Sequence, residues 1–305
     1  MINRLKYSDT VWIDLNQPNE KEIQSVIDEF AISPFIINDL IAPSVKSRVE
    51  MHEKHLFLIL HFPVFKHSHS GDHHQEVDFI IGDKFLMTVR YDTVDPIEKF
   101  QKKVEVDTIL HRKAFDSGSS GALFFEIIKE IYQSLFDELD YIANWINKIE
   151  LNIFSGQERE MVFALSDVSR TLLNFKKATS FHREVLKDLH ALGQKLFDDH
   201  FTIHVTKAIN EYEKLENNLH NATESMSELR ETNNSLVSTK QNEIMKILTI
   251  FASIAFPMTI VAAAFGISST NIPFIGNPND FWIVVGIMGT VALSMLLFFV
   301  HKKWL

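Results

Sequence analysis

The run ILTIFASIAFPMTIVAAAF occupies Ile247–Phe265, and a second run, FWIVVGIMGTVALSMLLFFV, occupies Phe281–Val300. Neither run contains Asp, Glu, Lys or Arg. A helix of about 20 apolar residues is long enough to cross a hydrocarbon core of roughly 30 Å. Trp282 and Trp304 lie near the ends of the second run, as in the aromatic belts of membrane proteins. We therefore predict two transmembrane helices, at 247–265 and 281–300, rather than a buried hairpin of a soluble core.

Basic residues near the two runs predict their orientation. Lys240 and Lys246 precede the first run, and Lys302 and Lys303 follow the second. The connecting loop, 266–280, contains neither Lys nor Arg. Because loops on the cytoplasmic side carry the excess of Lys and Arg, both termini are expected in the cytoplasm and the loop outside the cell membrane.

The residues before the first run predict a cytoplasmic region in two parts. Residues 1–116 have the pattern of an α+β domain, with strands at 10–15, 55–62, 76–81 and 84–91 and helices at 19–30, 34–40 and 95–111. Gly82 and Asp83 indicate a tight hairpin between the last two strands. After a turn-rich break at 116–121, residues 122–246 predict a helical hairpin, 122–153 and 157–197, and then a stalk helix. The membrane part is 247–305.

The stalk has the most regular apolar spacing in the chain. Its apolar positions alternate steps of four and three, a 3.5-residue repeat that is typical of supercoiled helices. No Gly or Pro occurs between Val205 and Phe256, so this helix is expected to continue into the membrane. The repeat consists of Phe201, Val205, Ala208, Tyr212, Leu215, Leu219, Ala222, Met226, Leu229, Asn233 and Leu236.

A polar stripe continues the same spacing through the first membrane run, along Asn242, Met245, Thr249, Ala252, Phe256, Thr259, Ala263 and Gly266. One such helix forms a pore only if several chains assemble around an axis. Neutral oxygens, here of Asn242, Thr249, Thr259 and Ser268, suit a pore that selects a cation such as Mg²⁺ by its hydration shell. Met245 and Phe256 are candidates for hydrophobic constrictions.

The segments NEIMKILT (Asn242–Thr249), PMT (Pro257–Thr259), Phe265–Gly266 and KKWL (Lys302–Leu305) resemble the CorA magnesium transporter family. The close similarity covers the chain from Asn242 onward, and the remainder is similar in layout. The resemblance implies a funnel-shaped homopentamer whose first membrane helices line one axial pore. It also implies pore-lining roles for Asn242, Met245, Leu248, Phe256 and Thr259.

The outer end of the first run departs from the family signature. The family has Gly-Met-Asn there, or Gly-Ile-Asn in a zinc-transporting branch, whereas this chain has Gly266, Ile267 and Ser268. The family asparagine offers a ring of amide carbonyls to a hydrated cation. The hydroxyl of Ser268 is on a shorter side chain. It is expected to contact the water molecules bound to the cation, with a weaker electrostatic field than the asparagine amide.

Three functions follow from these features. The first is a divalent cation channel, most simply for Mg²⁺ and otherwise for Co²⁺ or Ni²⁺, gated by cytosolic divalent ions. The second is a zinc transporter of the same family. The third is a non-conducting, membrane-tethered sensor or scaffold, which the loss of the signature asparagine suggests.

Two further clusters are candidate metal sites. His67, His69, His73 and His74 crowd one stretch, which predicts either a site for Zn²⁺, Ni²⁺ or Co²⁺ or a solvated polar loop. The glutamates of the stalk form either a solvated helical face or carboxylates bridged by cytosolic Mg²⁺; they are Glu211, Glu213, Glu216, Glu224, Glu228 and Glu231. Glu231 lies about three helical turns before Asn242 on the same stripe, which makes it the candidate for a ring at the pore mouth.

Composition argues against several other functions. The formal net charge of −10 disfavours nucleic acid as a partner, because phosphate binding requires a basic face. The chain has no cysteine, so it forms neither a disulfide nor a thiolate metal site. It has neither a phosphate-binding glycine loop nor a Gly-x-Ser-x-Gly motif, and we expect no enzymatic activity.

Overall fold

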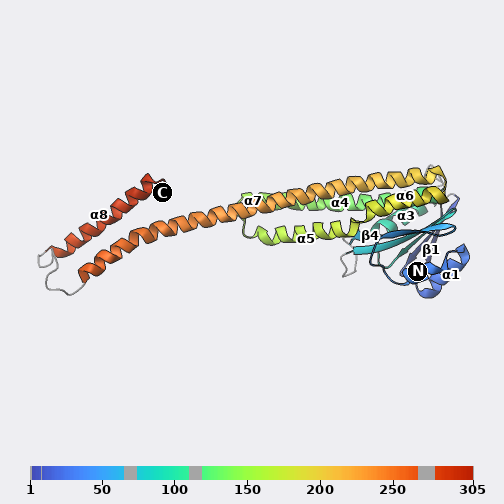
Figure 1. Cartoon of the computed structure of the whole chain (residues 1–305), viewed down its shortest axis with the longest axis horizontal. Coiled ribbons are helices and arrows are strands. Elements are labelled where there is room, and N and C mark those ends of the chain that lie inside the picture. Colours follow the sequence, from blue (N-terminus) through green and yellow to red (C-terminus); the bar gives the residue numbers. More distant parts are fainter. Residues whose placement is uncertain (1, 8, 65–73, 110–118, 267–278, 305) are drawn as a thin grey trace. The chain divides into compact units, whose positions relative to one another are not determined.

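The computed structural model describes residues 2–7, 9–64, 74–109, 119–266 and 279–304 (Figure 1). The chain forms two units, Met1–Arg230 and Glu231–Leu305. The first contains a mixed sheet with helices on both faces, and the second contains two apolar helices. This architecture confirms the predicted class: an α+β domain, a long helix and two C-terminal membrane helices.

A six-stranded sheet organises the first unit, in the order β1-β2-β6-β5-β4-β3. Only β2 and β6 pair in parallel, and every other neighbouring pair is antiparallel. The strands are β1 (Ile2–Tyr7), β2 (Thr10–Asn16), β3 (Arg48–Met51), β4 (His55–Pro63), β5 (His74–Gly82) and β6 (Phe85–Arg90).

The four predicted strands are confirmed, together with the hairpin between β5 and β6. The sequence analysis missed β1 and β3, which are the two edge strands. Charged residues interrupt both of them, at Arg4 and Lys6 in β1 and at Arg48 and Glu50 in β3. Charges are common on edge strands, where they discourage pairing with another chain.

One face of the sheet packs against α1 (Glu20–Phe30), η1 (Pro34–Ile36) and α2 (Ile37–Ile41). A capping box starts α1, because the Asn19 side chain accepts from the Glu22 amide and the Glu22 carboxylate accepts from the Asn19 amide, both at 2.9 Å. Ile23, Val26 and Ile27 of α1 are buried against the sheet.

The opposite face is covered by α4 (Ser120–Phe154), α5 (Met161–Thr179) and α6 (His182–Leu196), and α3 (Asp95–Ile109) packs on α4 (Figure 1). The prediction of one helix over 157–197 is wrong, because the chain turns at Ser180 and Phe181. His182, which starts α6, is fully buried and bonds the Tyr132 hydroxyl (3.0 Å) and the His61 carbonyl oxygen (2.7 Å). These bonds anchor the new helix to the sheet.

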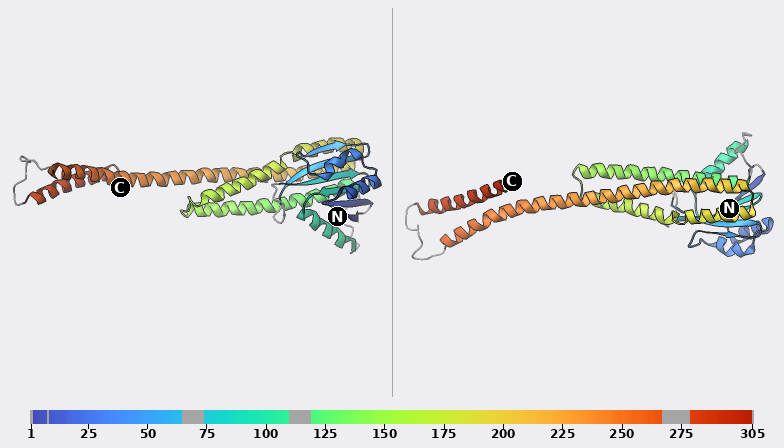
Figure 2. Two further views of the ribbon diagram at one scale, coloured as in Figure 1. Left: turned by 90° about the horizontal axis from the view of Figure 1, so that it is seen from below. Right: turned by 45° about the horizontal axis from the view of Figure 1, so that its top comes forward.

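The helix α7 (Asp199–Gly266) is continuous for 68 residues and passes Pro257 without ending. Within the first unit its 3.5-residue stripe is buried against α4 and α6, and Figures 1 and 2 show α4 and α7 side by side. A Cβ added to Gly193 would lie 2.3 Å from the Phe201 ring, so only glycine permits this approach. The repeat therefore serves packing inside one chain.

The second unit contains the end of α7 and α8 (Asp280–His301). Both helices include a stretch that is long and apolar enough to cross a membrane, and only 6% of each stretch is buried inside the chain. A soluble core would bury such surface, so the exposure supports a lipid environment.

Candidate functional site

The predicted pore-lining side chains share one exposed face of α7. Asn242, Met245, Leu248, Thr249, Phe256, Thr259 and Gly266 are all exposed in the single chain. The covered positions of this part of the helix lie elsewhere on its circumference and include Ile250. The chain itself therefore leaves this face uncovered, open to water, lipid or further copies of the chain.

The two threonine hydroxyls of this face bond to the helix that carries them. Thr249 Oγ1 donates to the Met245 carbonyl oxygen and Thr259 Oγ1 donates to the Phe256 carbonyl oxygen, both at 2.7 Å. Because each proton is used inside the helix, the oxygen lone pairs remain free to accept. A hydrated cation presents water hydrogens outward, and these require acceptors of this kind.

Large apolar side chains lie between these polar positions. Met245 and Leu248 are each 58% exposed, and Phe256 is 68% exposed. On a pore axis, rings of such side chains form constrictions that close when water leaves them.

The stalk glutamates do not form one set. Arg183 pairs with Glu213 at 2.9 Å and also contacts Glu216, and Lys214 pairs with Glu211 at 2.8 Å. These three carboxylates have cationic partners within their own chain. For them this favours a solvated helical face over carboxylates bridged by Mg²⁺. Glu231 is exposed on α7, and its role at a pore mouth stays a prediction.

Gly266, the first residue of the predicted outer filter Gly266-Ile267-Ser268, is described, but the other two residues and most of the histidine cluster lie outside the described residues. This applies to Ile267 and Ser268, and to His67, His69 and His73. His74 is described: it is exposed at the start of β5, with its ring 5.2 Å from the ring of His61. Within the described part of the chain, no group of three or more His, Asp or Glu side chains is placed to hold a metal ion.

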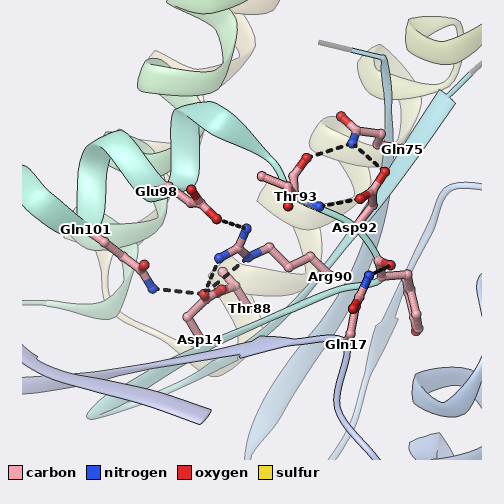
Figure 3. A network of polar contacts seen from close by, with 10 residues as sticks. Asp14, Gln17, Gln75, Thr88, Arg90, Asp92, Thr93, Glu98 and Gln101 are labelled. Carbon is pink, nitrogen blue, oxygen red and sulfur yellow. Dashed lines mark hydrogen bonds and ion pairs between the residues drawn. The ribbon is translucent and has the colours of Figure 1, made fainter. Parts of the chain in front are cut away.

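The sequence analysis missed a buried polar network at the parallel strand pair (Figure 3). The Asp14 carboxylate accepts from Thr88 Oγ1 (2.6 Å), from Gln101 Nε2 (2.8 Å) and from Arg90 NH2 (3.0 Å). Asp14 and Arg90 are 2% and 3% exposed. Every charge of this buried ion pair has a hydrogen-bonding partner, as a stable buried pair requires. We therefore interpret the network as structural.

A second missed cluster lies on β4 and β5. Glu76 Oε2 accepts from the Ser44 amide at 2.7 Å and lies 3.0 Å from His61 Nε2. Asp78, which is 0% exposed, accepts from the Tyr91 hydroxyl at 2.9 Å. Glu76 Oε1 and Asp78 Oδ1 have no donor among the described side chains. Burial, and then the charge of Glu76, favour a proton on Asp78, and a proton shared between the two carboxyl groups would give both atoms a partner.

We expect Asp78→Asn to remove a pH dependence from the stability of the protein. Burial, and then the charge of Glu76, raise the pKa of Asp78 well above its usual range. Above a pH of about 4 the unfolded chain has lost this proton whereas the folded protein keeps it, so stability falls as pH rises toward the folded pKa. The measurement is the melting temperature of the purified full-length protein between about pH 5 and 9, a range above the unfolded pKa of Asp78. The melting temperature should fall less steeply with pH for Asp78→Asn than for the parent.

The matched control is Asp83→Asn, because Asp83 is exposed in the β5–β6 turn. Its melting profile should follow that of the parent protein. If Asp78→Asn lowers the melting temperature equally at every pH, then Asp78 is ionised in the folded protein and the shared proton is wrong.

These features define a class of protein: an integral membrane protein with a soluble α+β domain, a long helix and two C-terminal membrane helices. Residues 7–303 match the family described as CorA-like Mg²⁺ transporter protein. The chain belongs to this family.

Curated relatives agree over nearly the whole chain. The chain is 24% identical over 301 residues to the cobalt/magnesium transport protein CorA of Thermotoga maritima, covering 98% of this chain and 84% of that protein. It is 25% identical to the cobalt/magnesium transport protein CorA of Methanocaldococcus jannaschii, covering 97% and 91%. The complete structure of the CorA magnesium transporter from M. jannaschii superposes with a TM-score of 0.83 at 22% identity, over 97% of this chain and 92% of that one.

Proposed function

We propose that this chain transports divalent cations, with Mg²⁺ and Co²⁺ as its substrates, through a pore formed by several copies. The observation that carries this proposal is the uncovered stripe of neutral oxygens on α7, at Asn242, Thr249 and Thr259. Family membership and the substrates named for the relatives from T. maritima and M. jannaschii support it.

The chemistry of the stripe fits a hydrated ion. Mg²⁺ gives up its water reluctantly and keeps several water molecules when bound. The stripe itself contains no carboxylate. Glu243 is the one carboxylate in the range 242–266, and it lies outside the spacing series. Neutral acceptors arranged in rings contact the hydration shell without binding the bare ion tightly, so the ion is able to leave.

The assembly we propose is a homopentamer with its α7 helices around one axis and both termini in the cytoplasm. In this arrangement the interior-negative membrane potential drives uptake, because each elementary charge gains about 2.3 kcal/mol per 100 mV. A divalent ion therefore gains about twice that energy. Cytosolic divalent ions that bind the soluble part are the proposed gating signal.

The test is ion uptake by the full-length protein in liposomes with an interior-negative potential. We expect Mg²⁺ and Co²⁺ uptake, and we expect Asn242→Ala to change its rate or ion preference. The matched control, Asn234→Ala, alters an exposed asparagine of α7 outside the spacing series and should behave as the parent does.

Three outcomes decide between the readings. If the protein takes up Zn²⁺ and Mg²⁺ does not compete with this uptake, the conclusion becomes zinc transport instead of magnesium transport. Uptake that appears only in Ser268→Asn would show that the natural chain is a non-conducting sensor or scaffold. A monomeric purified protein would exclude the shared pore altogether.

A further inference from the structure

A pair of histidines flanks the tight turn between β3 and β4. His52 and His55 enclose Glu53 and Lys54, and the His52 amide donates to the His55 carbonyl oxygen at 2.9 Å. Residues directly opposite each other at such a turn project to the same face of the hairpin. The two imidazole rings accordingly stack, with centroids 4.9 Å apart and planes inclined by 17°.

The outer ring nitrogens of both histidines make no hydrogen bond, and that of His52 has only a long contact to the Glu50 carboxylate. Nε2 of His52 and Nε2 of His55 are shielded from solvent, and neither makes a hydrogen bond within the described structure. His55 is only 3% exposed. A buried polar atom without a hydrogen bond is destabilising, so the buried and unbonded Nε2 of His55, next to the ring of His52, indicates a place for a ligand.

Other buried histidines of the same domain show what a structural role looks like. His61 bonds Ser47 Oγ through Nδ1 and the Ser44 carbonyl oxygen through Nε2, both at 2.9 Å. His182 also uses both ring nitrogens, with Tyr132 and with the His61 carbonyl oxygen. Against these fully bonded rings, the open Nε2 atoms of His52 and His55 need a different explanation.

A cavity adjoins the pair. It has a volume of about 480 Å³ and is lined by residues 31–35 and 51–55, which bring together the loop after α1 and the β3–β4 turn. Since a water molecule occupies about 30 Å³, this space admits an ion with its remaining water ligands.

A carboxylate lies near the ring of His52. Glu50 precedes His52 by two residues on the same strand face, and its Oε2 lies 3.8 Å from His52 Nε2. Its other oxygen, Oε1, accepts from Arg48 Nε at 2.7 Å, which leaves Oε2 available.

We propose that the Nε2 atoms of His52 and His55 bind one first-row transition-metal ion, such as Zn²⁺, Ni²⁺ or Co²⁺, in this cavity. Imidazole nitrogen suits these ions, whereas Mg²⁺ prefers oxygen. Water or Glu50 completes the coordination, because no group of three or more His, Asp or Glu side chains among the described residues is already placed to hold a metal ion. The stacked rings are nearly parallel, so binding of one ion by both Nε2 atoms requires the rings to turn about their Cβ–Cγ bonds. The site is separate from the proposed transport stripe, and it stands whether or not the chain conducts ions.

The test is a Co²⁺ titration of the full-length protein, purified without a polyhistidine tag. The background variant carries Gln in place of His67, His69, His73 and His74, so that the histidine-rich stretch does not contribute. In excess Mg²⁺, which occupies the sites proposed for transport and gating, we expect one Co²⁺ per chain with visible absorption bands. His52→Gln and His55→Gln should each weaken binding by about ten-fold or more, since even outer-shell changes at metal sites have effects of that size.

His220→Gln is the matched control, because His220 is exposed on α7, and it should leave the titration unchanged. A melting temperature that rises with Co²⁺ in the background variant but not in His52→Gln would support the site further. If His55→Gln does not fold, His52→Gln decides alone. Unchanged Co²⁺ stoichiometry and affinity in His52→Gln, or no Co²⁺ bound by the background variant, would overturn the proposal.

Discussion

Thr259→Phe is expected to reduce Mg²⁺ uptake into liposomes by about ten-fold or more, because a ring of bulky apolar side chains excludes the hydrated ion from a narrow pore. Thr259 is exposed on α7 one step from Phe256, and its hydroxyl is bonded within its own helix. The replacement therefore breaks no contact that holds the chain together. The measurement is the initial uptake rate, with assembly size checked on the same preparation.

Thr290→Phe provides the matched control for this effect. Thr290 is an exposed threonine of α8, and its Oγ1 donates to the Gly286 carbonyl oxygen at 2.8 Å, as the hydroxyls of α7 do within their helix. A side chain that faces lipid should tolerate the change, and uptake should remain near that of the parent. Equal losses in the two variants would mean that Thr259 lies no closer to the pathway than Thr290.

The parts of the fold with strong periodicity were predictable from the sequence. The short apolar runs of β4 to β6, the 3.5-residue stripe of α7 and the two long apolar runs each identified an element correctly. The failures occurred where long-range contacts override the local pattern. The break between α5 and α6 depends on His182 meeting Tyr132, 50 residues away, and on its bond to His61, 121 residues away.

The candidate sites differ in the same way. The stripe on α7 could be predicted because all of its residues belong to one helix and recur at a regular spacing. The carboxyl pair left a partial signal, since Glu76 and Asp78 alternate with Val77 and Phe79 at the start of the predicted strand 76–81. The pair of His52 and His55 required the hairpin register, because β3 was too short and too charged to be predicted as a strand. Without that strand, the two histidines are only residues in a polar segment.

Asp14→Ala is expected to destabilise the soluble domain by about 3–5 kcal/mol, because it leaves the buried guanidinium of Arg90 without its counter-charge. Arg90 is 3% exposed and its NH2 lies 3.0 Å from Asp14 Oδ2. Glu98, the other carboxylate that Arg90 contacts, lies 3.3 Å away and is 37% exposed, so it compensates poorly. The melting temperature of the full-length protein should fall on the order of 10 °C.

The double variant Asp14→Leu/Arg90→Met separates an unpaired charge from a lost contact. Apolar replacement of both members of a buried ion pair is often nearly neutral, so the double variant should melt well above Asp14→Ala. Arg183→Met, which breaks a surface pair with Glu213, should change the melting temperature little, because solvent screens such pairs. A double variant as unstable as Asp14→Ala would mean that the hydrogen bonds from Thr88 and Gln101 stabilise this junction, and that the charge of Arg90 is not the cause.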